Sequence, residues 1–134
     1  MSDDKKGRPK ATPPVAPEIR AGESTAAVQI KMTRYFNRLR AYWQACGIAV
    51  DSTDGEAQIT RLAAILRVQG NRGLGSLEGR IAGAMVQLPA RIQDLQERGF
   101  EIAAPRESAY GGDGLMHRRC ARYFLLAEPQ RGGA

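Results

Sequence analysis

The chain has 134 residues, which is room for one domain with short extensions. Its 20 Lys and Arg exceed its 14 Asp and Glu, and the resulting net charge of +6 favours a polyanionic partner, with nucleic acid first. No apolar run near the start has the form of a secretory leader and none is long enough to cross a bilayer, so we expect a cytoplasmic protein without a membrane partner.

Residues 1–24 are rich in proline and poor in large apolar side chains. Such a segment buries too little surface to offset the entropy of ordering it, so we expect a flexible basic arm. Within this arm, Lys5 to Lys10 resembles an AT-hook, in which a Gly-Arg-Pro core lies in the narrow minor groove of A·T-rich DNA. Arg8 would then contact DNA. The alternative is an ordinary solubilising tail.

Residues 25–50 contain the first predicted helix, because apolar side chains recur there at helical spacing until Gly47. The apolar stripe includes Val28, Met32, Phe36, Leu39 and Trp43. Arg34 and Arg38 belong to the same helix, which carries no acidic residue. Two interpretations stay open. Either the helix packs on its own domain and its arginines are solvated, or the stripe forms a homodimer interface and the arginines lie along DNA phosphates.

A polar linker at 51–55 precedes a second predicted helix at 56–70. Apolar side chains recur in it at spacings of three, four and seven, and Asp54 can cap its first turn. After a glycine-rich turn, a short helix is predicted over residues 76–84. Its inward-facing side chains are expected to be Leu77, Ile81 and Ala84.

The next predicted helix spans 88–98 and has Pro89 in its first turn, where proline is tolerated. Beyond it the apolar period changes to two, which predicts strands at 100–102 and 119–126. The glycine-rich stretch between them, 105–117, is expected to form the tip of a wing.

These elements give a predicted organisation in four parts: an arm at 1–24, a basic amphipathic helix at 25–50, a winged helix-turn-helix at 56–128 and a disordered tail at 129–134. The corresponding fold class is mainly α with a small β-hairpin (α+β), which is a winged helix-turn-helix with an added N-terminal helix. This architecture places one helix end and one basic hairpin at a spacing that fits a DNA groove.

Two sequence patterns carry a resemblance to a known family. The first is ARI..L..RG..I from Ala90 to Ile102, and the second is ARY.L from Ala121 to Leu125. With Ser76-Leu77-Glu78, they make roughly half of the chain similar to small winged helix-turn-helix proteins of phages and bacterial mobile elements. The resemblance implies a DNA-binding and regulatory role. The chain departs from the pattern at 84–87, where many members have Gly-Ile, and its wing is long.

The start and exposed face of the third helix would enter the major groove. The side chains expected to reach outward from it are Gln87, Arg91, Gln93 and Asp94. Arginine can bind guanine O6 and N7, and glutamine can bind adenine N6 and N7. Arg91 is expected to matter most. Its alternative role is a salt bridge to Glu78 or Asp94 that only stabilises the fold.

Arg118, Arg119 and Arg122 flank the predicted wing and are expected to contact phosphates or the minor groove. Strict alternation along a strand separates Arg119 from the other two, so all three face DNA only if the strand is twisted or bulged. The alternative is that one or two of them protect an exposed sheet edge. Arg72 and Arg80 are secondary candidates for phosphate contacts.

The sequence gives little support for an enzymatic function. His117 is the only histidine, and no Ser/His/Asp or Cys/His set can be assembled around it. Cys46 and Cys120 lack metal-ligand spacing, and no glycine-rich loop has the form of a nucleotide site. We therefore expect no catalytic residue, cofactor or metal.

The predicted function is that of a double-stranded DNA-binding protein, a transcriptional regulator or an accessory factor of a nucleoprotein complex, acting as a homodimer. The alternative is a winged-helix adaptor that binds other proteins in a larger phage or mobile-element assembly, because a fold does not dictate its function.

Overall fold

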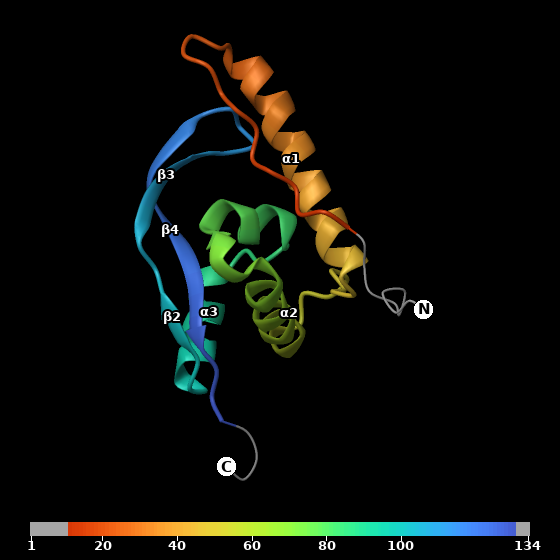
Figure 1. Ribbon diagram of the computed structural model, residues 1–134, viewed down its shortest axis with the longest axis vertical. Helices are drawn as coiled ribbons and strands as arrows, with labels where there is room; N and C mark the ends of the chain where they lie inside the picture. The colour runs from red at the N-terminus through yellow and green to blue at the C-terminus, as the bar shows by residue number, and fades with distance from the viewer. Residues whose placement is uncertain (1–10, 131–134) are drawn as a thin grey trace.

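The computed structural model describes residues 11–130 of the chain (Figure 1). Residues 1–10, with Arg8 and the AT-hook-like motif, and residues 131–134 lie outside that description. The helical elements are α1 (Thr25–Ala45), α2 (Gly55–Gln69), η2 (Gly70–Arg72), η3 (Glu78–Ala82) and α3 (Leu88–Glu97). The strands are β1 (Leu74–Gly75), β2 (Glu101–Ala103), β3 (Arg106–Tyr110) and β4 (Met116–Ala127). The chain is thus an α+β winged helix, and the predicted fold class is confirmed.

The sheet is organised around the long strand β4. Within the described part of the chain, β4 pairs antiparallel with each of the other three strands. β3 pairs with its first half, while β1 and β2 pair with its second half. The predicted hairpin corresponds to β2 and β4, and β1 and β3 were missed. Because β3 lies inside the stretch expected to be a loop, the turn at the wing tip is only residues 111–115.

α1 packs on the domain of its own chain. Ser24 caps the helix by accepting a hydrogen bond from the Ala27 amide at 3.1 Å. The predicted interface residues are all buried in the common core, at 0–7% exposure: Val28, Met32, Phe36, Leu39 and Trp43. Trp43 also donates its indole N–H to Gln69 at the end of α2. The stripe is therefore core, and the expectation that these side chains form a homodimer interface is corrected.

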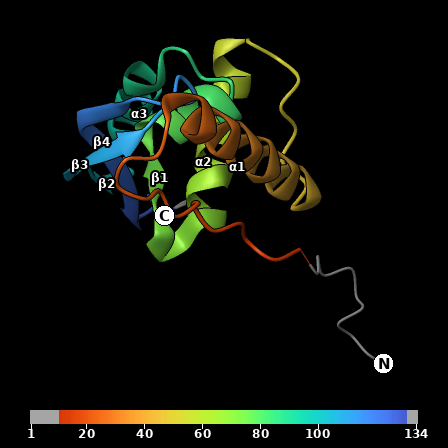
Figure 2. The same cartoon turned by 90° about the horizontal axis from the view of Figure 1, so that it is seen from above.

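Part of the predicted arm is packed as well. Residues 11–24 run beside α1 (Figures 1 and 2), and Ile19 packs against the core. Lys31 of α1 donates to the backbone carbonyl of Glu18 at 3.0 Å and pairs with the carboxylate of Glu23 at 2.7 Å. The arm is thus not free over residues 11–24, because an apolar side chain and a lysine bind it to the helix.

α2 is the central helix and begins as predicted. Asp54 accepts a hydrogen bond from the Ala57 amide, which satisfies one free donor of the first turn. Arg61 in its middle is only 4% exposed. The Arg61 guanidinium donates to the carbonyls of Ala49, Ser52 and Gly83. One buried cation thereby joins the linker before α2 to the turn before α3.

The short helix before that turn differs from its prediction. η3 is a π-helical turn in which the Gly83 amide donates to the Glu78 carbonyl five residues earlier. The wider turn changes which side chains face inward, so Ile81 is 43% exposed although it was expected in the core. Gly79 faces the core instead. A Cβ there would lie 2.7 Å from Leu88 of α3, so glycine is what permits the close contact.

Candidate nucleic-acid interface

An open groove lies between the start of α3, η3 and strand β4. We call it the arginine groove, because Arg80, Arg106, Arg118 and Arg119 line it. None of the residues that line it is acidic, and these four arginines form no ion pair with any residue between 11 and 130. Unpaired guanidinium groups in an open groove create a field that attracts phosphate.

A β-bulge brings two of these arginines to the groove. In the β3–β4 ladder Glu107 pairs with Cys120 and Ala109 pairs with His117, so Ser108 opposes two residues of β4. Those two residues are Arg118 and Arg119. Arg119 has a φ of +58°, in the left-handed region that non-glycine residues rarely adopt. The bulge interrupts the alternation, and both arginines are exposed and line the groove.

The wing tip is held in place by α1. The side-chain amide of Gln29 donates to the Asp113 carbonyl at 3.2 Å. Gly114 has a φ of +80°, and a Cβ at that position would lie 2.5 Å from the Thr25 carbonyl oxygen. Figure 1 shows the β3–β4 hairpin curving toward the start of α1. The strand that carries the groove arginines is therefore fixed at its tip by close backbone contact.

Helix α3 presents one of the predicted base readers to the groove. Gln87 directly precedes α3, is exposed and lines the groove. Its amide can donate to and accept from an adenine edge. Val86, beside it, is 71% exposed and lines the same groove. In helix-turn-helix proteins the start of this helix is the part that contacts base edges in DNA.

Comparison with known proteins agrees with this geometry. A family model described as a winged helix-turn-helix domain matches residues 57–128, which is more than half of the chain. This chain belongs to the winged helix-turn-helix domain family. No curated protein and no solved structure matches it.

The other predicted side chains of the recognition helix do not reach the groove. Arg91 is partly buried and lies 2.9 Å from Asp94, although its Nε–H is not aligned for a hydrogen bond. Its guanidinium faces the start of α2, 3.7 Å from where a Cβ on Gly55 would be. Gln93 is exposed but donates to Glu97 at 3.2 Å. Arg91 thus adopts its alternative role, an ion pair within the winged helix, because its position on α3 faces α2.

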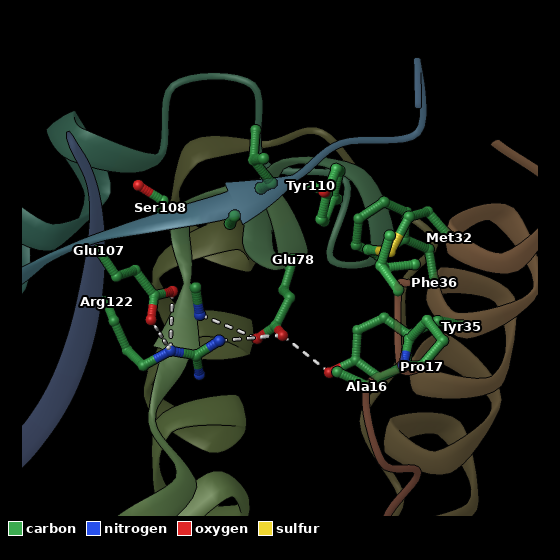
Figure 3. Close-up of a pocket in the computed structure, with 14 residues that line it drawn as sticks. Ala16, Pro17, Met32, Tyr35, Phe36, Glu78, Glu107, Ser108, Tyr110 and Arg122 are labelled. Atoms are coloured by element: carbon green, nitrogen blue, oxygen red, sulfur yellow. Dashed lines mark hydrogen bonds and ion pairs between the residues drawn. The ribbon is translucent and has the colours of Figure 1, made fainter. Parts of the chain in front are cut away.

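Arg122 of the wing is also turned inward. Its guanidinium donates to both carboxylate oxygens of Glu107 and to Glu78 at 3.2 Å (Figure 3). A further N–H donates to the carbonyl of Arg72 at 2.8 Å. Burial alone would lower the pKa of Arg122, but the two carboxylates outweigh burial and raise the pKa. The expectation that Arg122 contacts DNA is corrected: it joins the winged-helix sheet to η3 and η2.

Three more predicted arginines lie outside the groove. Arg72 stacks over the ring of Tyr42 at 5.7 Å and donates to the Val68 carbonyl. Arg34 and Arg38 are exposed on the outer face of α1, where they line a separate depression. Any contact of Arg34 and Arg38 with DNA is therefore a contact outside the arginine groove.

Arg106 was not among the DNA-contacting residues predicted from the sequence. It is the first residue of β3, and its Nη1 lies 3.4 Å from the Arg119 carbonyl at the bulge. Residues 106–110 (RESAY) show no apolar alternation that would mark a strand, so the sequence carried no clear signal for β3. The glycines that follow led to its assignment as loop.

Among residues 11–130, no group of three His, Cys, Asp or Glu is placed to hold a metal ion. No helix in the same range has the length and apolarity needed to cross a membrane.

Proposed function

We propose that this winged helix binds double-stranded DNA through the arginine groove, as a transcriptional regulator or an accessory factor of a nucleoprotein complex in a phage, plasmid or similar element. The observation that carries the proposal is the convergence of four arginines, none of them in an ion pair among residues 11–130, on the exposed side chain that starts the recognition helix. Arginines on β3, β4 and η3 would bind phosphates, and Gln87 would contact a base edge.

Salt dependence tests the phosphate contacts. Each phosphate neutralised by the groove steepens the fall of log affinity with log salt by about 0.9. Arg118→Gln should therefore weaken binding to all duplexes alike and reduce the slope by about 0.9. The matched control is Arg67→Gln, which removes one positive charge from α2 outside the groove, where Arg67 pairs with Glu128. Fluorescence anisotropy of a labelled duplex measures both slopes, and equal slopes for the two variants would contradict the proposal.

Base selection tests the role of the recognition helix. Gln87→Ala should cost about 1–3 kcal/mol on the preferred duplex and relax the preference at one position. Arg91→Ala should leave the base preference unchanged, because Arg91 is paired with Asp94 away from the groove. Selection of bound duplexes from a random pool, followed by competition binding, gives both numbers. A larger change of preference with Arg91→Ala would restore Arg91 as the base reader.

One observation favours the alternative of a protein-binding adaptor. Val86, Ile81 and Met116 are exposed apolar side chains beside the arginines, at 71%, 43% and 45%. Exposed apolar side chains grouped beside charges are typical of protein contacts as well as of thymine methyl contacts. Absence of duplex binding at about 50 mM salt, where phosphate contacts are strongest, would favour the adaptor.

A further inference from the structure

A second cavity lies on the side of the β3–β4 hairpin where α1 and the segment 16–19 pack. Its walls come from six parts of the chain: the segment 16–19, α1, β1, η3 with the preceding Leu77, β3 and Arg122 of β4. Its volume is about 220 Å³. This cavity is separate from the groove: apart from Leu77, no residue lines both.

Aromatic and thioether side chains form one side of this cavity. Figure 3 shows Tyr110 of β3 facing Phe36 and Met32 of α1. Phe36 and Met32 are nearly fully buried, and Tyr110 is half-buried. Aromatic faces carry a negative quadrupole, so they attract a cation that has lost part of its water.

Charged side chains form the other side. Glu78 and Glu107 lie there with Arg122 between them (Figure 3). Two carboxylates and one guanidinium leave an excess of one negative charge in a chain whose net charge is +6. Glu78 is 7% exposed and holds hydrogen bonds from Tyr35 at 2.7 Å and Gly75 at 2.9 Å. Its position is therefore fixed before any ligand enters.

Glu107 has acceptor capacity that the fold leaves unused. Both of its oxygens accept from the single Nε–H of Arg122, at 3.1 and 2.9 Å. A carboxylate has about four lone-pair sites, so one shared N–H leaves most of them available. The Glu107 side chain is 32% exposed, and the residue lines the cavity. An ammonium group there would meet a carboxylate while its organic part met the aromatic side.

We propose that this cavity binds a small organic ammonium compound with an aromatic or compact apolar body. The excess carboxylate selects for positive charge, the rings of Tyr110 and Phe36 contact the apolar body, and the volume limits the ligand to a small molecule. Arg122 is already bound by two carboxylates, so an anionic ligand would gain no free guanidinium and would be repelled by Glu107.

Three small aromatic probes of different charge test this assignment on the full chain: benzylammonium, benzyl alcohol and benzoate, each titrated by two-dimensional amide NMR. Saturable shifts around Tyr35, Ser108 and Tyr110 are expected, with benzylammonium binding roughly five- to tenfold tighter than the alcohol and benzoate weakest. Equal affinities for the three probes, shifts confined to other regions or no saturation would each overturn the proposal.

Variants separate a ligand role from a structural one. Glu107→Gln should abolish the preference for benzylammonium over benzyl alcohol, while Glu101→Gln, an exposed carboxylate on β2, should leave it unchanged. Tyr110→Leu keeps an apolar wall and should weaken benzylammonium severalfold more than benzyl alcohol. A dispersed NMR spectrum verifies that each variant is folded. Because DNA binding is measured separately, its failure and the failure of this site are distinguishable.

Discussion

At the scale of single residues, the arginine groove depends on one unusual backbone conformation. Arg119 occupies the left-handed region in the β4 bulge, where a residue with a Cβ is strained by about 1–2 kcal/mol. Glycine would relieve that strain. The residue found there is instead an exposed arginine that lines the groove. Under the proposed function, arginine at this position makes the fold less stable but provides a phosphate contact.

Arg119→Gly should separate these two effects. It removes the strained Cβ and keeps the bulge, so the free energy of unfolding should rise by about 0.5–1 kcal/mol after the entropy of glycine is included. It also removes a cation, so duplex affinity should fall with a shallower salt slope. Urea denaturation and anisotropy measure the two quantities on one preparation. A variant that is less stable than the parent would show that the arginine side chain supports the bulge.

At the scale of elements, Arg61 of α2 fixes the segments around the helix-turn-helix. It reaches the linker through Ala49 and Ser52 and the turn before α3 through Gly83. Arg61 is only 4% exposed, this burial lowers its pKa, and no carboxylate pairs with it among residues 11–130. Its hydrogen bonds to carbonyl dipoles compensate for that burial.

Arg61→Met should therefore be strongly destabilising. The aliphatic stem is kept, but three carbonyl oxygens lose a charged donor, and we expect a loss of about 2–4 kcal/mol in the free energy of unfolding. Arg61→Lys should recover part of the loss, because an ammonium cannot match the spread of a guanidinium. Urea denaturation gives both values. A loss below about 0.5 kcal/mol, the range of ordinary surface substitutions, would show that water replaces the guanidinium at these carbonyls.

At the scale of the whole molecule, α1 is integrated with the winged helix by polar as well as apolar contacts. Tyr35 donates to Glu78 of η3, and Arg40 donates to the carbonyls of Ile81 and Ala82 at the end of η3. Burial, and then the charge of Glu78, raise the pKa of Tyr35 in the folded protein. The raised pKa makes the free energy of unfolding vary with pH in the alkaline range.

The sign follows from proton binding. Above the ordinary tyrosine pKa of 10.0, the unfolded chain releases the Tyr35 proton while the folded chain retains it. The folded state then binds more protons, so stability falls as pH rises beyond about 10. Tyr35→Phe should be less stable at neutral pH by about 1–3 kcal/mol, because Glu78 loses a buried donor, but its stability should fall less steeply above pH 10. Burial also raises the pKa of Tyr123, so the stability of both proteins keeps some dependence on alkaline pH. Urea denaturation at several pH values measures this, and parallel curves would assign the alkaline loss to other groups.

The sequence by itself determined the three α-helices, the strands β2 and β4 and the family, because these follow from local periodicity, caps and glycine placement. Asp54 and Ser24 at the helix starts and the change of period after α3 are signals of this kind. Tertiary structure alone decided which arginines are free. Arg91 and Arg122 are paired because of what packs beside them, whereas Arg118 and Arg119 share the groove because a bulge interrupts their alternation. Residue types along one chain do not encode the distance to a partner side chain or a one-residue slip of register. Those depend on how strands and helices meet in space.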